Sequence, residues 1–364
     1  MKRRLLLMSG LGGVGIALLA AATLCLSAGC STLDYYAQSV GGHLSLLRAA
    51  RPVPEWLADA QVDLKLKERL ALTQRMRDFA VSELHLPDNA SYRRYAELPR
   101  SAAVWNVVAA PELSLSLKTS CFPVLGCVGY RGFFDRAQAD GFAAQLGEQG
   151  LEVTVYGVPA YSTLGRLPGA WMADPLLSTF VNWTEGELAR LIFHELSHQV
   201  AYADDDTMFN ESFATAVERI GGARWLAAHG STRAREDYQR FDGRRQDFRA
   251  LTQKHRTLLA ALYGASMPDA DKRAQKALLM QAFRAEFEAL KTGRWGGFPG
   301  YDGWVARANN ASFGVLAAYN DLVPQFERLF EHEGRDFARF YTEVRRLAGL
   351  PKEQRRAALN PAGE

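Results

Sequence analysis

Apolar residues in the first hundred positions recur at helical intervals. The pattern runs from Leu33 to Leu86 and stops at a Pro-Asp-Asn segment, so residues 30–100 are predicted to form a helical N-terminal segment. The pattern then changes to short runs rich in β-branched residues. Strands are predicted there at the following positions: 104–108, 113–117 and 151–158. A helix at 135–150 should cross between the last two, so region 101–183 is predicted to be a small sheet with one crossover helix.

Helical spacing returns at Thr184. Thr184 and Glu187 stand three residues apart just before an apolar run, which is the pattern of a capping box at a helix N-terminus. Residues 184–230 are therefore predicted to hold two helices, with Gly221-Gly222 as a point of interruption. These helices carry the candidate chemistry described below.

A helical C-terminal region is predicted at 231–350, with Pro268 at the turn of a long hairpin. Residues 351–364 are polar and are expected to fray. The chain is thus predicted to be an α+β protein. Its N- and C-terminal parts should be mostly helical, and its small sheet should precede the helix that starts at Thr184.

The charge balance gives no indication of a nucleic-acid partner. The 364 residues carry a formal net charge of +3, with 48% hydrophobic and 23% charged residues, which is ordinary for a globular protein. No basic run alternates with aromatic residues as a nucleic-acid groove would require. The arginine-rich stretch 233–256 alternates with acidic and apolar residues, a pattern typical of a solvated helix face. We therefore expect no nucleic-acid partner.

The first 29 residues have the pattern of an export signal, with a positive start, an apolar run at 5–26 and small residues before Cys30. A cysteine after Ala-Gly resembles the bacterial lipobox, in which the thiol receives a diacylglycerol, although the usual leucine stands one place early at Leu26. The resemblance implies a lipid anchor on Cys30 and a periplasm-facing protein, and Ser31 in place of aspartate implies the outer membrane. Ordinary signal cleavage and an uncleaved membrane anchor are the alternatives.

Two cysteines remain in the predicted mature chain, Cys121 and Cys127. A close pair in an exported protein suggests a disulfide that closes a loop. No further cysteine or histidine lies nearby in the sequence, which argues against a zinc site at this pair. A pair of free thiols is the alternative.

The most specific pattern is His194-Glu195-Leu196-Ser197-His198, inside the helix predicted after Thr184. Histidines four residues apart lie about 40° apart around a helix and one turn along it, so both rings can reach one ion. Glu195 lies about 100° further round, where it meets a water on the ion instead of the ion itself. Zinc lowers the pKa of such a water towards ~7, and a glutamate can take its proton. The pattern predicts zinc-dependent hydrolysis of peptide bonds, with Glu195 as general base.

A catalytic zinc needs a third protein ligand, and two acids compete for that position. Glu211 begins the next predicted helix and shares a stripe with Glu218 that can face the histidines. Asp204 stands where a metzincin-like pattern places its ligand, but Ala201 replaces the glycine which that pattern requires. Helix geometry favours Glu211, and 204–206 are then a solvated turn. Glu218 is expected either to orient a ligand histidine or to be a surface acid.

The motifs also resemble those of known proteins. The pair HELSH and NESFATAVE resembles the gluzincin arrangement, in which an NExxA-type helix supplies the third ligand. A bacterial family described as putative aminopeptidase, often lipoprotein-like, has similar runs: CFPVLGCVGYRGFFD, PAYSTLG, DPLLSTF and ELARLIFHELSHQ. The resemblance implies a zincin-like fold, a peptide substrate, Zn²⁺ on His194, His198 and Glu211, and Glu195 as the base. The chain has no counterpart of the GxMEN segment that holds a substrate amine in aminopeptidase N-type enzymes, so the general peptidase activity transfers better than the aminopeptidase label.

Two questions stay open at the level of sequence. An oxyanion needs a donor besides the metal, often a tyrosine in gluzincins, and Tyr161 and Tyr319 are the candidates, although a tyrosine at such positions is more often an amphipathic core residue. A second reading of the whole chain is a non-catalytic envelope lipoprotein that uses the metal site as a structural or binding platform. The intact Glu195 favours the enzyme, because a structural site does not require that glutamate.

Overall fold

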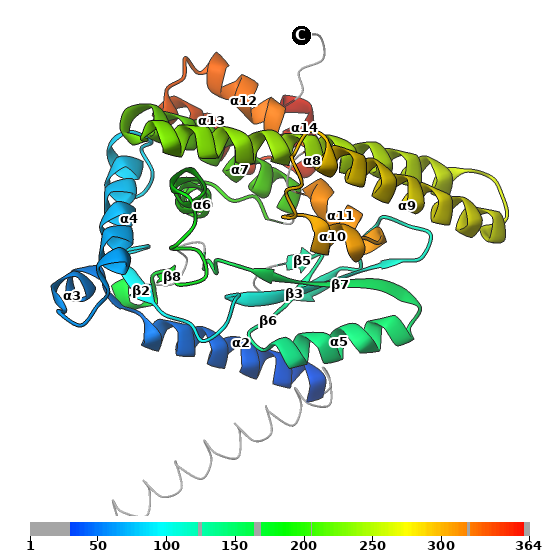
Figure 1. The fold of residues 1–364 in the computed structure, drawn as a ribbon, viewed down its shortest axis with the longest axis horizontal. Coiled ribbons are helices and arrows are strands. Elements are labelled where there is room, and N and C mark those ends of the chain that lie inside the picture. The colour runs from blue at the N-terminus through cyan, green and yellow to red at the C-terminus, as the bar shows by residue number, and fades with distance from the viewer. Residues whose placement is uncertain (1–29, 123–125, 164–168, 205, 319–320, 360–364) are drawn as a thin grey trace, which may run out of the picture.

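The computed structural model describes the following residues: 30–122, 126–163, 169–204, 206–318 and 321–359. The predicted signal segment, residues 1–29, lies outside them, and Cys30 is the first residue of helix α2 (Cys30–Ala49). Within the described residues, no helix combines the length and the apolar character needed to cross a bilayer. The architecture is α+β, as predicted, with long helices around small sheets (Figure 1).

The N-terminal segment is helical, but it is broken into three helices. Helix α2 is followed by α3 (Val53–Ala58) and α4 (Leu64–Ser82). Between α2 and α3, the two-residue strand β1 (Arg51–Pro52) pairs antiparallel with β2 (Arg94–Ala96). Strand β2 pairs in parallel with β8 (Leu176–Leu177), which closes a three-stranded sheet. This sheet therefore ties the N-terminal helices to the chain just before the predicted catalytic helix.

A second sheet has β3 (Val104–Pro111) at its centre, between β6 (Arg131–Phe133) and β7 (Leu151–Val158). Both pairings are antiparallel, and Trp105 lies opposite Phe133 on one side and Gly157 on the other. Helix α5 (Arg136–Glu148) packs on this sheet, and its N-terminus is capped by the Asp135 side chain, which accepts from Gln138 N. The predicted strands at 104–108 and 151–158 and the crossover helix are confirmed.

The predicted strand at 113–117 is wrong. This segment has no regular secondary structure and lies against helix α11 (Asn310–Ala318), where a Cβ on Gly314 would approach Leu115 O to 2.7 Å. Packing against that helix replaces strand pairing. The next residues form a hairpin of β4 (Ser120–Phe122) and β5 (Gly126–Val128), in which a disulfide joins Cys121 and Cys127.

The remainder of the described chain is almost entirely helical. A short 3₁₀ helix, η1 (Ala170–Met172), comes first. The α-helices that follow are α6 (Glu185–Ser197), α7 (Thr207–His229), α8 (Thr232–Gly264), α9 (Asp269–Thr292), α10 (Asp302–Ala306), α11, α12 (Val323–His332), α13 (Phe337–Ala348) and α14 (Lys352–Leu359). The α8–α9 hairpin turns at Pro268, as predicted. The prediction of a frayed tail is wrong for residues 352–359, because they form α14, in which Arg355 is buried.

Helix α6 lies at the centre of the largest core. Its residues Leu188, Ile192 and Leu196 recur every four positions and are fully buried, and Phe193 joins them. Each such side chain contributes roughly 1.5–3 kcal/mol by leaving water. In Figure 1, α6 lies between α4 and the second sheet, and the long helix α8 passes across α7. The helix that carries the HExxH pattern is thus held on several sides.

The predicted capping box at the start of α6 is wrong in its contacts. Thr184 is the N-cap residue, but its hydroxyl is buried and makes no hydrogen bond among the described residues. Glu187 turns away from the helix end and binds Arg245 of α8 at 2.5 Å. The long-range ion pair has replaced the local contact. This pair belongs to a network that reaches the candidate site.

Candidate metal centre

Helices α6 and α7 bring three potential ligands together. Nε2 of His194 lies 3.3 Å from Nε2 of His198, and both point towards Glu211 Oε2, at 3.3 and 3.8 Å respectively. One ligand atom from each residue lies within 4.8 Å of the others, and all three side chains are largely buried. Two imidazoles and a carboxylate with this spacing are a donor set that can hold a metal ion.

Glu218 fixes the orientation of the first histidine. Its Oε2 lies 2.9 Å from His194 Nδ1, and a carboxylate can only accept, so Nδ1 carries a proton and Nε2 is the nitrogen that a metal would use. Glu218 in turn pairs with Arg190, one turn earlier on α6. Burial alone would raise the pKa of Glu218, but Arg190 and His194 outweigh it and lower the pKa to about 2. The carboxylate is therefore held in its charged form.

The electrostatics of the site favour a bound cation. Burial acts to lower the pKa of His194, yet the carboxylates of Glu211 and Glu218 outweigh burial and raise this pKa well above its ordinary value. Burial lowers the pKa of His198 to about 4, so this ring is neutral. The cluster thus stabilises positive charge next to a neutral imidazole, and a divalent ion satisfies both conditions at once. The residues present fit the metal.

A family comparison covers nearly all of the described chain. The family model described as "Putative aminopeptidase" matches residues 34–359, which run from α2 to the end of α14. The chain belongs to this family. No curated protein and no solved structure matches the chain. Membership in the putative aminopeptidase family suggests a peptidase, and the matched span contains all three clustered side chains.

In this aminopeptidase-family chain, Glu195 is half-buried beside the cluster. Burial raises its pKa to about 7, while the positive charge at His194 acts in the opposite direction. Its electrostatic neighbours include Asp174, which is 1% exposed. Asp174 accepts from the Thr163 backbone N at 2.9 Å and from the Ser162 hydroxyl at 3.2 Å, so it ties the loop after β7 to this side of α6. Sequence analysis did not single out Asp174.

The loop between α6 and α7 is fixed by two polar side chains. Asn210 accepts from Ala203 N at 2.8 Å and donates to Ala203 O at 2.9 Å, which sets the entry into α7 next to Glu211. Asp206 caps α7 by accepting from Phe209 N and is 2% exposed. The prediction of a solvated turn at 204–206 is therefore wrong at Asp206, which is buried because two arginines of α14 neutralise its charge. Asn210, the asparagine of the NExxA pattern, was the sequence feature from which this fixed loop could have been predicted.

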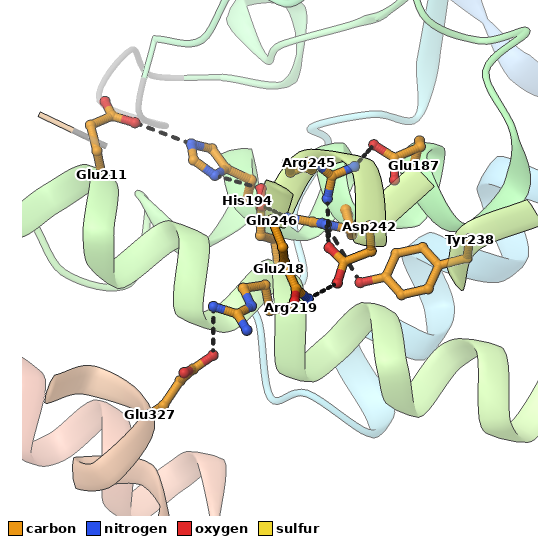
Figure 2. Close-up of polar contacts among 11 residues, drawn as sticks. Glu187, His194, Glu211, Glu218, Arg219, Tyr238, Asp242, Arg245, Gln246 and Glu327 are labelled. Atoms are coloured by element: carbon orange, nitrogen blue, oxygen red, sulfur yellow. Dashed lines mark hydrogen bonds and ion pairs between the residues drawn. The ribbon is translucent and has the colours of Figure 1, made fainter. Parts of the chain in front are cut away.

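An ion-pair network continues from His194 to α8 (Figure 2). Arg190 lies 3.1 Å from Asp242, and Asp242 lies 3.1 Å from Arg245. Arg245 closes the chain by binding Glu187 of α6. The prediction that stretch 233–256 is a solvated face is corrected at Arg245, because Glu187 of α6 and Asp242 bind it, whereas the side chain of Arg233 is 91% exposed.

Tyr161, the oxyanion donor suggested by the sequence, packs against aromatic rings of the N-terminal part and of the chain just after β6. The ring of Tyr161 packs against His43 and Phe134, with centroids 5.4 and 5.1 Å away. Tyr319, the other candidate, lies outside the described residues. Two tyrosines that sequence analysis did not propose for this role are close enough to be influenced by the charge of Glu211. Burial first, and then Glu211, raise the pKa of Tyr130 and of Tyr156, the latter to about 12. Tyr130 lies within the run CFPVLGCVGYRGFFD, whereas no sequence pattern marked Tyr156.

Proposed function

We propose that this protein is a zinc-dependent peptidase with a zincin-like arrangement of its α6 and α7 helices. The supporting observation is the cluster of His194, His198 and Glu211, whose ligand atoms all lie within 4.8 Å of one another. Membership in the "Putative aminopeptidase" family supports hydrolysis of peptide bonds independently of that geometry. Glu195, next to the first histidine, supplies the group that a purely structural site would lack.

The roles of the residues follow from their placement. His194, His198 and Glu211 would hold Zn²⁺, which when bound lowers the pKa of a coordinated water towards ~7 and polarises a carbonyl. Glu195 accepts the proton of the attacking water and delivers it to the leaving amine. Glu218 keeps the Nδ1 proton of His194 in place, so that Nε2 stays available as a ligand. Burial of the site strengthens each of these interactions.

The deciding experiment is the substitution Glu195→Gln in protein loaded with zinc. We expect the variant to fold and bind zinc as the wild type does, and to lose peptide hydrolysis by about 10²- to 10⁴-fold, the usual contribution of a general base. Glu236→Gln, at an exposed position of α8, is the matched control and should keep full activity. Undiminished hydrolysis by Glu195→Gln would contradict the assigned role. Metal binding without activity in either protein would favour the non-catalytic platform.

Where the enzyme cuts its substrate decides between the two peptidase classes. The family description indicates an aminopeptidase, which we adopt as the proposed activity. Mass-spectrometric mapping of products from a mixed peptide pool tests it directly. Ladders that shorten by one residue from the amino end support an aminopeptidase, whereas internal cuts identify an endopeptidase.

We also propose that the protein is anchored by a lipid on Cys30 and faces the periplasm, at the outer membrane. The support is the signal-like pattern of residues 1–29 and the small residues before the cysteine. Helix α2 begins at Cys30 itself, and it contacts β2 and β6. A lipid at this position would therefore connect to the folded domain without a long linker.

A further inference from the structure

A cavity of about 400 Å³ lies between the metal-site helices and the C-terminal helices. His194 and Glu218 form part of its wall on the side of α6 and α7. One face of α8 forms the opposite wall. The size falls within the range of ligand-binding pockets, roughly 300–1,000 Å³. Of the proposed metal-site residues, His194 lines the cavity, whereas Glu195, His198 and Glu211 do not, so the cavity borders the site on the side of His194 that faces Glu218.

The apolar part of the lining is aromatic. Phe248 of α8 stacks on Tyr301 with centroids 4.0 Å apart, and Trp304 meets Phe248 edge to face at 5.1 Å. Trp304 also contacts Phe313 of α11, with centroids 5.6 Å apart. These rings are held by one another, so they present a rigid wall suited to the apolar body of a substrate residue.

The polar part of the lining contains arginines that are paired with acids and arginines that are not fully paired. Arg190 and Arg245 are paired with the acids of the network described above. Arg249 lines the cavity and has no hydrogen bond or ion pair to its guanidinium within the described part of the chain. Burial, and then the neighbouring Arg219 and Arg190, lower the pKa of Arg249, while Asp242 and Glu218 act in the opposite direction.

A second arginine on the same face is incompletely paired. Arg256 stands two turns after Arg249, and its nearest acid is Asp321, 4.0 Å away. Its Nε is buried and makes no hydrogen bond among the described residues. A buried donor without a partner carries a free-energy cost that a suitable ligand would remove. Gln253, between the two arginines on α8, also lines the cavity and offers an amide donor.

We propose that this cavity is the subsite for a carboxylate of the substrate, bound by Arg249 and Arg256 beside the aromatic wall. A planar guanidinium recognises a carboxylate through paired hydrogen bonds. The proposal rests on the proposed function and adds a substrate class to it: peptides that carry a carboxylate able to reach past His194 into this cavity. The carboxylate is either the free C-terminus of a short peptide or an Asp or Glu side chain.

The test compares matched peptides on matched variants. One cleavable peptide is prepared with a C-terminal carboxylate or amide, and with Glu or Gln on either side of the cleaved bond. In the wild type we expect the acidic member of one pair to have a kcat/KM about 10- to 100-fold higher, the strength of a hydrogen bond to a charged group. Arg249→Gln should reduce that ratio towards one. Arg233→Gln, an arginine of α8 with a 91% exposed side chain, should leave the ratio unchanged.

Equilibrium binding separates this proposal from the proposed function. The Kd of the same peptides is measured by calorimetry on zinc-loaded Glu195→Gln protein, with and without Arg249→Gln. Tighter binding of the acidic peptides that depends on Arg249 supports the subsite, even if the wild type cleaves no peptide and the peptidase proposal fails. Equal Kd values for acidic and neutral peptides, or a preference that survives Arg249→Gln, would overturn the subsite while leaving any measured hydrolysis intact.

Discussion

Arg355 of the last described helix, α14, donates to Asp206 Oδ2 at 2.7 Å, and both side chains are buried. Asp206 is the N-cap residue of α7, the helix that carries Glu211. Arg355 also donates to three backbone carbonyls near the end of α13 and the start of α14. The C-terminal segment therefore fixes the start of a metal-site helix, although it lies far from that helix in the sequence.

Removal of this contact should destabilise the protein. We expect Arg355→Met to lower the free energy of unfolding by about 3 kcal/mol, because it leaves a buried carboxylate with Arg356 as its remaining ion-pair partner. Urea denaturation measures the change. Arg339→Met, at a position 65% exposed and 3.5 Å from Glu333, is the matched control and should cost less than about 1 kcal/mol. Similar losses in both variants would contradict the structural role of Arg355.

The contact between Glu218 and His194 should tune metal affinity. We expect Glu218→Gln to weaken zinc binding by about 10- to 100-fold, because the ligand histidine loses the carboxylate that orients its ring and raises its basicity. Competition with a chromogenic chelator measures the dissociation constant. Glu236→Gln provides the control with the same change of charge on an exposed helix surface. An unchanged affinity would mean that other contacts suffice to hold the ring.

The identity of the third ligand can be tested by metal content. We expect Glu211→Ala to empty the site, because Glu211 Oε2 lies within 3.8 Å of both histidine Nε2 atoms. Asp204→Ala should retain about one zinc per chain. Plasma mass spectrometry on dialysed protein provides the count. If only the aspartate substitution removes zinc, the assignment of Glu211 is wrong.

Tyrosine-to-phenylalanine variants separate the oxyanion candidates. We expect Tyr130→Phe or Tyr156→Phe to lower kcat by about 10- to 100-fold with zinc content unchanged, because the charge of Glu211 reaches both phenols. Tyr161→Phe, measured in parallel, tests the residue indicated by sequence. A loss confined to Tyr161→Phe would support the sequence prediction and reject the two tyrosines of the sheet.

The lipid anchor has its own test. Expression of the full chain with labelled fatty acid should label the wild type and leave Cys30→Ser unlabelled, because the thiol is the proposed acceptor. The variant should also move from the membrane fraction to the soluble fraction, unless the apolar run at 5–26 stays attached as an anchor. Equal labelling of both proteins would exclude Cys30 as the lipidated residue.

Local geometry determined what the sequence could predict. Ligand spacing within α6 depends only on the helical repeat, so His194 and His198 were predictable as neighbours from four residues of chain. The strand at 151–158 was predictable for the same reason, since alternation marks one face of a sheet. The stripe that joins Glu211 and Glu218 on α7 is likewise a property of one helix, and both carboxylates do face His194.

Tertiary structure decided which polar residues are buried and with which partner. The sequence predicted Glu187 to be a capping residue, but in the structure it binds Arg245, 58 positions later in the chain. Asp206 looked solvated, but its partner Arg355 is 149 positions away. Gly221 and Gly222 were expected to interrupt the helix, yet they lie inside α7, where a Cβ would strike Phe193 and the Arg190 stem. Burial and pairing depend on segments that are distant in the chain, and a periodic pattern carries no information about them.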